Sequence, residues 1–332
     1  MQNKYYQKFQ TLTPSNNATT KDVIEIEGTS HVLSISKEGY PMFFVVTEDT
    51  NATTQNVKRE NLSVEYNVPC TIVEDDIKTT EGFYTIITLT THDVELQESF
   101  IELFALVLAK YQKNPRVKDI SYELDKLITI FEALSRPPKK KVQGLWGELL
   151  VIESSSNPDA LIHAWHSQPD AKYDFSIGTD KIEVKTTSTE QRVHRFSLDQ
   201  LNPSEHSRLL VASITVRESA KGQTGLSIYD LYDKICEQVE SPETRLLMYT
   251  VILNTLGQDA IKAGKIYFDY TEASDSLAFF NAEEIPSISK ENIHPLITGV
   301  KFYSNVSNLE DVRCNQDFPW NSDLFQYLKN RR

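Results

Sequence analysis

The alternation of apolar and polar residues predicts a β-rich amino-terminal region. Between residues 21 and 95, short apolar runs are separated by polar turns, a pattern typical of strands. The runs read DVIEIEG, HVLSIS, PMFFVVTED, CTIVED and GFYTIITLTT. We therefore expect residues 1–95 to form a β-rich module.

Two helical patterns follow this module. Residues 96–113 and 117–134 carry apolar side chains at intervals of three and four, as packed helices do. We interpret residues 96–136 as a helical connector. The pair Pro137-Pro138 and the run Lys139 to Lys141 then interrupt the pattern and mark the start of a third region, residues 137–332.

The third region predicts an α/β domain with a mixed sheet. Its first half reads as a helix, strands, a turn or short helix, and a long apolar strand, at residues 142–155, 172–177, 181–187, 193–198, 199–207 and 208–218. Its second half predicts helices at 225–239 and 242–256 and strands at 265–273 and 297–307.

Composition narrows the class of protein. A chain of 332 residues with 39% apolar residues can bury a sizeable core. Its longest apolar stretch, residues 100–109, contains Glu102 and falls short of the roughly 20 residues that a membrane span needs. The amino terminus lacks the apolar core of a secretory signal, so we expect a cytoplasmic protein. The widely spaced Cys70, Cys236 and Cys314 predict reduced thiols.

Charge is unevenly distributed along the chain. A net charge of −13 argues against a protein that coats nucleic acid without specificity, because such binding depends on neutralising phosphates. Residues 136–200, however, contain nine basic and nine acidic residues. This locally neutral segment permits a polyanionic substrate.

The segment YDFSIGTDKIEVKTT contains the most informative residues. Side chains alternate along a strand, so Glu183 and Lys185 share one face, while Ile182 and Val184 point the other way. We place Asp174 at the carboxyl end of the preceding candidate strand. Gly178 and Asp180 lie in a stretch that can turn the chain back, so a hairpin would bring Asp174 beside Glu183.

Two neighbouring carboxylates point to a bound cation. Repulsion between them is relieved when a cation lies in between, and Mg²⁺ prefers carboxylate oxygens and water. A nearby lysine can position water or stabilise negative charge, a combination that suits metal-assisted phosphodiester hydrolysis. The alternative interpretation is a surface strand with a Glu/Lys ion pair contributing under about 1 kcal/mol.

These residues resemble a known superfamily. Asp174, Glu183 and Lys185 are similar to the D…(D/E)-x-K core of the PD-(D/E)XK nucleases, and GLWGELLVIE resembles their first core helix, with Glu148 at the matching position. The resemblance implies a restriction-endonuclease-like core, with a mixed central sheet flanked by helices, beside the N-terminal β-rich module. Tyr173 stands where the superfamily has proline.

A narrower resemblance suggests a biological setting. The segments GLWGEL, YDF, IEVKTT, HRFSLDQL, LLVASITVRE and GLSIYDLYDKI resemble a bacterial PD-(D/E)XK family. Its members occur in restriction-like phage-defence gene clusters beside helicase-like ATPases and DNA methyltransferases, which implies such partners here.

The resemblance also implies roles for individual residues. Asp174, Glu183 and the Val184 carbonyl would hold Mg²⁺, for which Mn²⁺ could substitute, and Glu148 would bind a second metal directly or through water. Lys185 would orient the attacking water. Gln200, shortly after the motif, would line the site. On the third strand, alternation puts Arg192 and His194 on one face and Arg195 on the other, and a lone strand histidine is more often structural.

The resemblance implies a Mg²⁺-dependent DNA endonuclease in bacterial defence. Residues 1–136 would then serve DNA binding or partner docking, and double-strand cutting favours a homodimer. The alternative is a catalytically silent or partner-dependent DNA-binding subunit of an ATP-driven complex, because the chain lacks a GxxxxGK[ST] loop. The absence of HExxH spacing argues against a zinc hydrolase. The lysine run is either a solvated linker or a phosphate contact.

Overall fold

The protein consists of two compact units in a computed structural model. The first contains residues 1–133 and 241–249, and the second contains residues 134–240 and 250–332. Helix α7 (Pro242–Leu256) begins in the first unit and ends in the second. The structure describes residues 4–14, 22–48, 54–59, 61–74, 78–111, 114–134, 138, 140–165, 171–204, 206–222 and 224–329.

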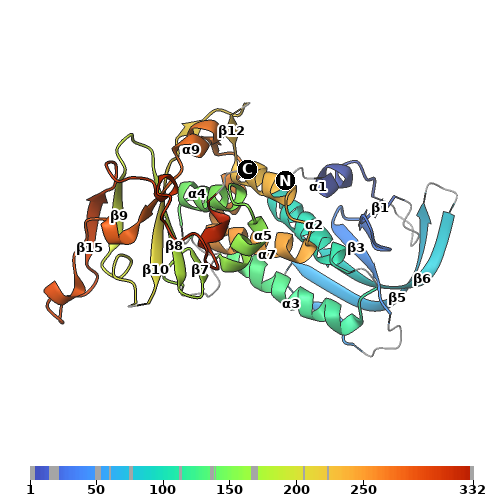
Figure 1. The fold of residues 1–332 in the computed structure, drawn as a ribbon. Helices are drawn as coiled ribbons and strands as arrows, with labels where there is room; N and C mark the ends of the chain where they lie inside the picture. The colour runs from blue at the N-terminus through green and yellow to red at the C-terminus, as the bar shows by residue number, and fades with distance from the viewer. Residues whose placement is uncertain are drawn as a thin grey trace. The chain divides into compact units, whose positions relative to one another are not determined.

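The first unit is built on an antiparallel sheet in the order β1-β2-β3-β6-β5-β4 (Figure 1). This confirms the β-rich amino-terminal part expected from the sequence. The apolar run that begins at Cys70 is only the end of a long strand, β5, because a bulge between Glu65 and Val68 lets the strand continue through a polar stretch. Its strands are β1 (Ile24–Glu25), β2 (Val32–Ile35), β3 (Pro41–Val46), β4 (Val57–Lys58), β5 (Leu62–Glu74) and β6 (Lys78–Leu89).

Besides the start of α7, the first unit contains the helices α1 (Lys4–Phe9), α2 (Val94–Ala109) and α3 (Val117–Leu134). Aromatic side chains join α2 to the sheet. The Phe43 ring of β3 meets the rings of Phe100 and Phe104 edge to face, at centroid distances of 5.6 and 4.8 Å. The apolar spacing that predicts α2 therefore places its phenylalanines in the core.

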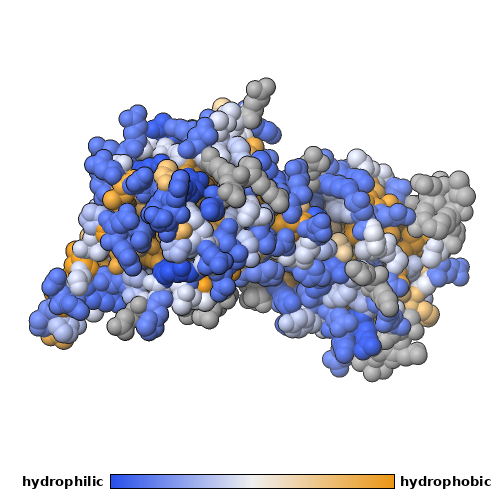
Figure 2. Space-filling view, in the orientation of Figure 1, coloured by the Kyte–Doolittle hydropathy of each residue, from blue (hydrophilic) through white to orange (hydrophobic). Residues whose placement is uncertain are grey.

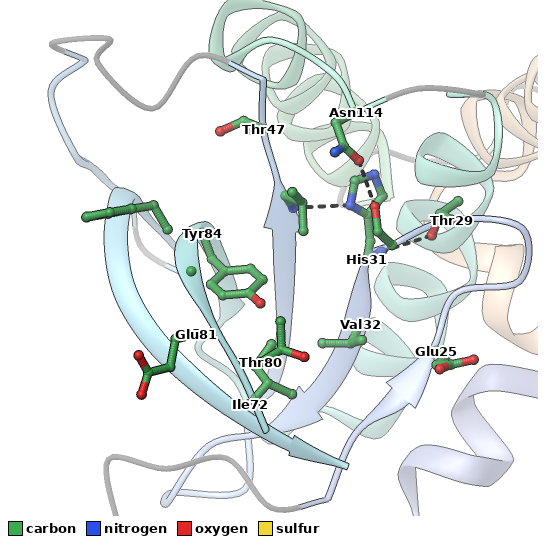
Figure 3. A pocket seen from close by; sticks show the side chains of 14 residues that line it. Glu25, Thr29, His31, Val32, Thr47, Ile72, Thr80, Glu81, Tyr84 and Asn114 are labelled. Carbon is green, nitrogen blue, oxygen red and sulfur yellow. Dashed lines mark hydrogen bonds between the residues drawn. The ribbon is translucent and has the colours of Figure 1, made fainter. Parts of the chain in front are cut away.

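The first unit also contains a cavity of about 530 Å³ (Figure 3). His31 at its edge is buried, and its Nδ1 accepts a hydrogen bond from the Val46 amide at 3.2 Å. Burial lowers the pKa of His31 to about 4, so the ring stays neutral and available as an acceptor at neutral pH. Ser30 donates to Asn114 Oδ1 at 2.7 Å beside it.

The second unit contains three small sheets and several short helices. Its strands are β7 (Phe175–Ile177), β8 (Asp180–Thr187), β9 (Val193–Ser197), β10 (Arg208–Thr215), β11 (Glu218–Ser219), β12 (Gly225–Leu226), β13 (Tyr267–Asp269), β14 (Ala278–Asn281) and β15 (Lys301–Asn305). Its α-helices, besides the end of α7, are α4 (Val142–Glu153), α5 (Pro158–Ala164), α6 (Ile228–Cys236), α8 (Ala260–Ala263) and α9 (Tyr270–Ser276). Single 3-10 turns lie at Gly257–Asp259, Ala282–Glu284, Lys290–Asn292, Val312–Cys314 and Phe325–Tyr327.

A mixed sheet forms the centre of this unit, in the order β14-β10-β8-β7. Strands β8 and β10 run parallel, from Asp180 opposite Arg208 to Thr187 opposite Thr215, while β7 and β14 pair antiparallel at the two edges. Helix α4 packs against β8 and helix α9 packs against β10. The predicted α/β class, with a mixed sheet flanked by helices, is confirmed.

The strand predicted at residues 193–198 is present as β9, but it pairs with β15 and lies outside the mixed sheet that contains β8. The strand predicted at 265–273 is the three-residue β13 followed by helix α9. The helix begins there because the Asp269 side chain accepts a hydrogen bond from the Glu272 amide, a helix cap.

The surface of the face shown in Figure 2 is mostly hydrophilic, with apolar patches, one of them at the end where β9 and β15 lie. Tyr303 of β15 is 71% exposed. Within the described ranges, no helix combines the length and the apolar character that a bilayer crossing requires.

Candidate active site

The hairpin of β7 and β8 brings Asp174 next to β8. Phe175 pairs with Ile182, and Gly178 turns the chain with a φ of +52°, a conformation that favours glycine. Asp174 lies directly before the first residue of β7, not at the carboxyl end of that strand as predicted. Its Oδ2 accepts a hydrogen bond from the Val184 amide at 2.8 Å, which fixes the carboxylate beside the middle of β8.

Glu183 and Lys185 form the pair that strand alternation predicts. The Lys185 ammonium donates to Glu183 Oε1 at 2.8 Å. Glu183 and Asp174 are each 5% exposed, so the interpretation of a solvated surface ion pair is wrong. The sheet is covered on both faces, and the carboxylates lie inside the unit.

Gln200 joins this pair from the loop after β9. Its Nε2 donates to Glu183 Oε1, and its Oε1 accepts from Lys185 at 3.4 Å and from the Ser197 amide at 3.0 Å. Tyr173, at the position of the superfamily proline, donates its hydroxyl hydrogen to the Gln200 carbonyl at 3.2 Å. The side chain of Gln200 is therefore held against Glu183 and Lys185.

Helix α4 positions Glu148 over β8 because Gly147 lets the two elements approach closely. A Cβ atom on Gly147 would lie 2.4 Å from the γ-methyl of Thr186, inside any real contact distance. Glu148 is 2% exposed, and its Oε2 accepts a hydrogen bond from Trp165 Nε1 at 2.7 Å. Trp165, at the end of α5, thus orients the carboxylate.

One ammonium joins Glu148 to Asp174. Lys140 Nζ donates to Glu148 Oε1 at 2.6 Å and also to Asp174 Oδ1. The structure therefore brings these two predicted residues to a common cation. Glu183, Lys185 and Gln200 form the adjoining cluster on β8.

Burial controls the electrostatics of Asp174 and Glu183. Desolvation raises the pKa of Glu183 to about 8, with Asp174 adding to the rise and Lys185 opposing it. Burial and the Glu148 charge also raise the pKa of Asp174, against the effect of Lys140. Ionised carboxylates at this place therefore need nearby positive charge.

The residues suit a hard divalent cation. Glu148 and Asp174 already share one cation, the Lys140 ammonium, and carboxylate oxygens are the ligands that Mg²⁺ and Mn²⁺ prefer. Within the described residues, no group of three or more Asp, Glu, His and Cys side chains is arranged to hold a metal. Mg²⁺ often binds only one or two carboxylates and completes its coordination shell with water and substrate phosphate. Glu148 and Asp174 are therefore enough to bind it.

Three further predicted residues lie on or beside β9. His194 is buried and its Nε2 lies 2.7 Å from Ser213 Oγ, while Arg192 donates to the Ser213 carbonyl at 2.7 Å. Arg195 points the other way and is exposed. The alternation of side chains along a strand predicts that Arg192 and His194 share one face and that Arg195 lies on the other. Burial lowers the pKa of His194 to about 4, consistent with a neutral structural residue.

Sequence reasoning missed the parts played by Lys140 and Trp165. Nothing in the spacing of the lysine run distinguishes Lys140, whose side chain reaches Asp174, 34 positions away. Trp165 belongs to no recognised motif, and its signal is a single tryptophan after a short proline-initiated helix.

Comparison with known proteins agrees with this geometry. A family described as "Putative PD-(D/E)XK family member (DUF4420)" has a model that matches residues 5–307, which include every candidate site residue. No curated protein and no solved structure matches the chain. The resemblance seen in the sequence is confirmed, and the chain belongs to this PD-(D/E)XK family.

Proposed function

We propose that the protein is a metal-dependent DNA endonuclease that acts in a restriction-like defence system against phage. Family membership supports nuclease-like chemistry. The observation that carries the proposal is the convergence of Glu148 and Asp174 on one cation, beside the cluster of Glu183, Lys185 and Gln200. Such an arrangement of acids and lysine suits hydrolysis of a phosphodiester.

Each residue has a distinct task in the proposed reaction. Glu148 and Asp174 would hold Mg²⁺ or Mn²⁺, with water and substrate phosphate completing its shell, and the adjoining Glu183 and the Val184 carbonyl stay predicted further ligands. When bound, the metal supplies a polarised water and neutralises charge on the phosphate. Asp174 is oriented by the Val184 amide and Glu148 by Trp165, so both acids are positioned before any ligand arrives.

Lys185 supplies the positive charge nearest to Glu183. Its ammonium, held by Glu183 and Gln200, orients the attacking water and stabilises the negative charge that develops at phosphorus. Gln200 positions Lys185 and Glu183 relative to each other. Its amide reaches both groups at once, so we propose that it aligns the site rather than moving a proton.

Charge near the site supports DNA as the substrate. The segment 136–200 is locally neutral in an acidic chain, which lowers repulsion of a polyanion there. Arg195, Lys301 and Tyr303 are exposed on one face of the β9–β15 pair. Cations and an aromatic ring are the groups that contact phosphates and nucleotides.

Cleavage of supercoiled plasmid by the purified chain tests the proposal. With Mg²⁺ or Mn²⁺ we expect nicking that Asp174→Asn and Lys185→Ala each slow by on the order of 10²-fold or more. Lys181→Ala is the matched control, because Lys181 lies on the same strand but donates to the Gly178 carbonyl. Metal-dependent nicking that survives Asp174→Asn and Lys185→Ala would refute the site.

The outcome of the same assay also decides between the two candidate roles. A wild-type chain that binds DNA but cleaves under neither metal, even with the products of neighbouring genes, would contradict the endonuclease. It would favour the catalytically silent subunit of an ATP-driven complex.

A further inference from the structure

Lys140 lies just before the helix that carries Glu148. It is two residues ahead of Val142, the first residue of α4, and its side chain is 33% exposed. Its two partners are far more buried, with side-chain exposures of 3% for Glu148 and 7% for Asp174. A flexible, partly solvated cation therefore reaches into a buried acidic pair.

One oxygen of each carboxylate is held by a hydrogen bond from elsewhere in the protein. Glu148 Oε2 accepts from Trp165, and Asp174 Oδ2 accepts from Val184. The other oxygens, Glu148 Oε1 and Asp174 Oδ1, both accept from Lys140. The ammonium thus stands at the place where one cation can contact both acids.

Charge explains why this place is filled by a lysine. Two ionised carboxylates in a buried site repel each other and lose hydration, and the cost is relieved by a cation between them. The Lys140 ammonium supplies that positive charge, since it donates to one oxygen of each carboxylate. The pair is compensated without metal.

We propose that the Lys140 ammonium is an internal substitute for the divalent cation, and that it must leave Glu148 and Asp174 before Mg²⁺ or Mn²⁺ can bind there. The proposal rests on the proposed function, because it concerns the same site. Metal binding is then an exchange of one cation for another, and the apparent metal affinity is the intrinsic affinity multiplied by the fraction of time that Lys140 is away from the two carboxylates. Its partly exposed side chain and its place before α4 allow it to move without unfolding the helix.

Mn²⁺ titration of the full chain by calorimetry tests this exchange. Lys140→Met removes the charge but keeps a chain of similar length, and we expect it to bind Mn²⁺ at least about ten-fold more tightly than wild type, as removal of a competitor requires. Lys141→Met is the matched control, since Lys141 is the exposed neighbour in the same run and we expect it to leave the affinity unchanged. If Lys140→Met binds Mn²⁺ no more tightly than wild type, the exchange is wrong.

Asp174→Asn separates this inference from the proposed function. Equal Mn²⁺ affinity in wild type and Lys140→Met, abolished by Asp174→Asn, would overturn the exchange and leave the metal centre standing. If neither protein shows Mn²⁺ binding that depends on Asp174, both proposals fall.

Chemical labelling of wild type follows the movement directly and does not depend on whether a variant folds. An ammonium held by two carboxylates reacts slowly with acetic anhydride, because acylation needs an accessible neutral amine. We expect Mn²⁺ to increase acetylation of Lys140 several-fold, measured by mass spectrometry, and to leave Lys141 unchanged. Acetylation of Lys140 that is unaffected by saturating Mn²⁺ would overturn the proposal.

Discussion

Glu102 of α2 is a buried acid that caps the helix α1. Its Oε1 accepts hydrogen bonds from the Tyr5 and Tyr6 amides at 2.9 and 3.0 Å, two amides of a first turn that lack partners within their helix. Glu102 is 6% exposed. Burial raises its pKa to about 7, and the two amide hydrogen bonds only partly offset that rise.

The raised pKa of Glu102 makes the first unit less stable as the pH increases. The folded state binds the Glu102 proton more tightly than the unfolded state, so this stabilisation is present below pH 4.5 and is lost as the pH rises to about 7. Glu102→Gln keeps an oxygen acceptor without the charge. Relative to wild type, we expect the variant to gain about 2 to 3 kcal/mol between pH 4.5 and pH 8.

Amide hydrogen exchange of peptides from α1 and α2, followed by mass spectrometry at several pH values, measures this gain. Glu25→Gln is the control, because Glu25 is an exposed acid on β1 of the same unit. Parallel stability profiles for Glu102→Gln and wild type would show that Glu102 ionises normally in the fold.

At the scale of single residues, the sequence predicted contacts that follow from local geometry. A period of two puts Glu183 and Lys185 on one face of β8, where the two side chains form an ion pair of 2.8 Å. The bond from Trp165 to Glu148 spans 17 positions and depends on how α5 packs, which no local period encodes. Residues that position a site residue across such a distance in the sequence, as Trp165 does, could therefore be identified only from the structure.

Close packing between α4 and β8 determines where Glu148 lies. Two glycines of the same helix provide a comparison, because a Cβ on Gly144 would meet nothing within 4 Å, whereas one on Gly147 would collide with Thr186. Alanine favours a helix over glycine by about 1 kcal/mol. Gly144→Ala should therefore stabilise the second unit by up to that amount.

Gly147→Ala should do the opposite. Overpacking costs about 1 to 3 kcal/mol, and the helix must move away from β8, taking Glu148 with it. Adding Thr186→Ser removes the colliding methyl group and should restore most of the lost stability. Denaturation followed by tryptophan fluorescence measures all three variants, since Trp146, Trp165 and Trp320 all lie in the second unit. Equal effects of Gly144→Ala and Gly147→Ala would contradict this account.

At the scale of elements, strands with a clear apolar period were predicted well, while their partners were not. Residues 193–198 read correctly as a strand, but the pairing of β9 with β15 joins segments about a hundred residues apart. The polar residues on the outer face of that pair gave no pairing signal. The predicted boundaries at residues 95 and 136 stay predictions.

The proposed function predicts that the exposed face of the β9–β15 pair contacts DNA. Arg195 lies opposite Tyr303, and Lys301 lies opposite Ser197, on the face away from buried His194 and Phe196. We expect Arg195→Ala to weaken DNA binding and to reduce the slope of log affinity against log salt by about 1, as loss of one phosphate contact does. Fluorescence anisotropy with labelled duplex DNA measures both quantities.

A matched substitution tests whether Arg195 acts by its position. Lys329→Ala removes an exposed cation from the carboxyl-terminal segment and should leave the salt slope unchanged. Equal losses for both variants would mean that net charge, rather than this strand pair, determines DNA affinity.

At the scale of the whole molecule, the carboxyl-terminal segment after residue 307 completes the second unit. Ser156, after α4, donates its amide hydrogen to the Tyr327 carbonyl at 2.9 Å. The Leu324 amide donates to Asp180 Oδ2 at 3.2 Å, and Asp180 begins β8. The segment thus fastens the strand that carries Glu183 and Lys185, although the family match ends before it.

Phe325 is the residue through which this attachment can be tested. It is 1% exposed, and the guanidinium of Arg208, which pairs with Asp180 at 2.6 Å, lies over its ring at 5.3 Å. Phe325→Ala removes a buried aromatic side chain and should lower the unfolding free energy of the second unit by about 3 kcal/mol. Gln326→Ala, at the exposed neighbouring position, should change it by less than about 0.5 kcal/mol. Urea denaturation followed by tryptophan fluorescence distinguishes the two variants. Unchanged stability of Phe325→Ala would mean that the carboxyl-terminal segment is not part of the folded unit.

The same substitution should also weaken Mn²⁺ binding, because Asp180, to which the segment is attached, begins the strand β8 that carries Glu183 and Lys185.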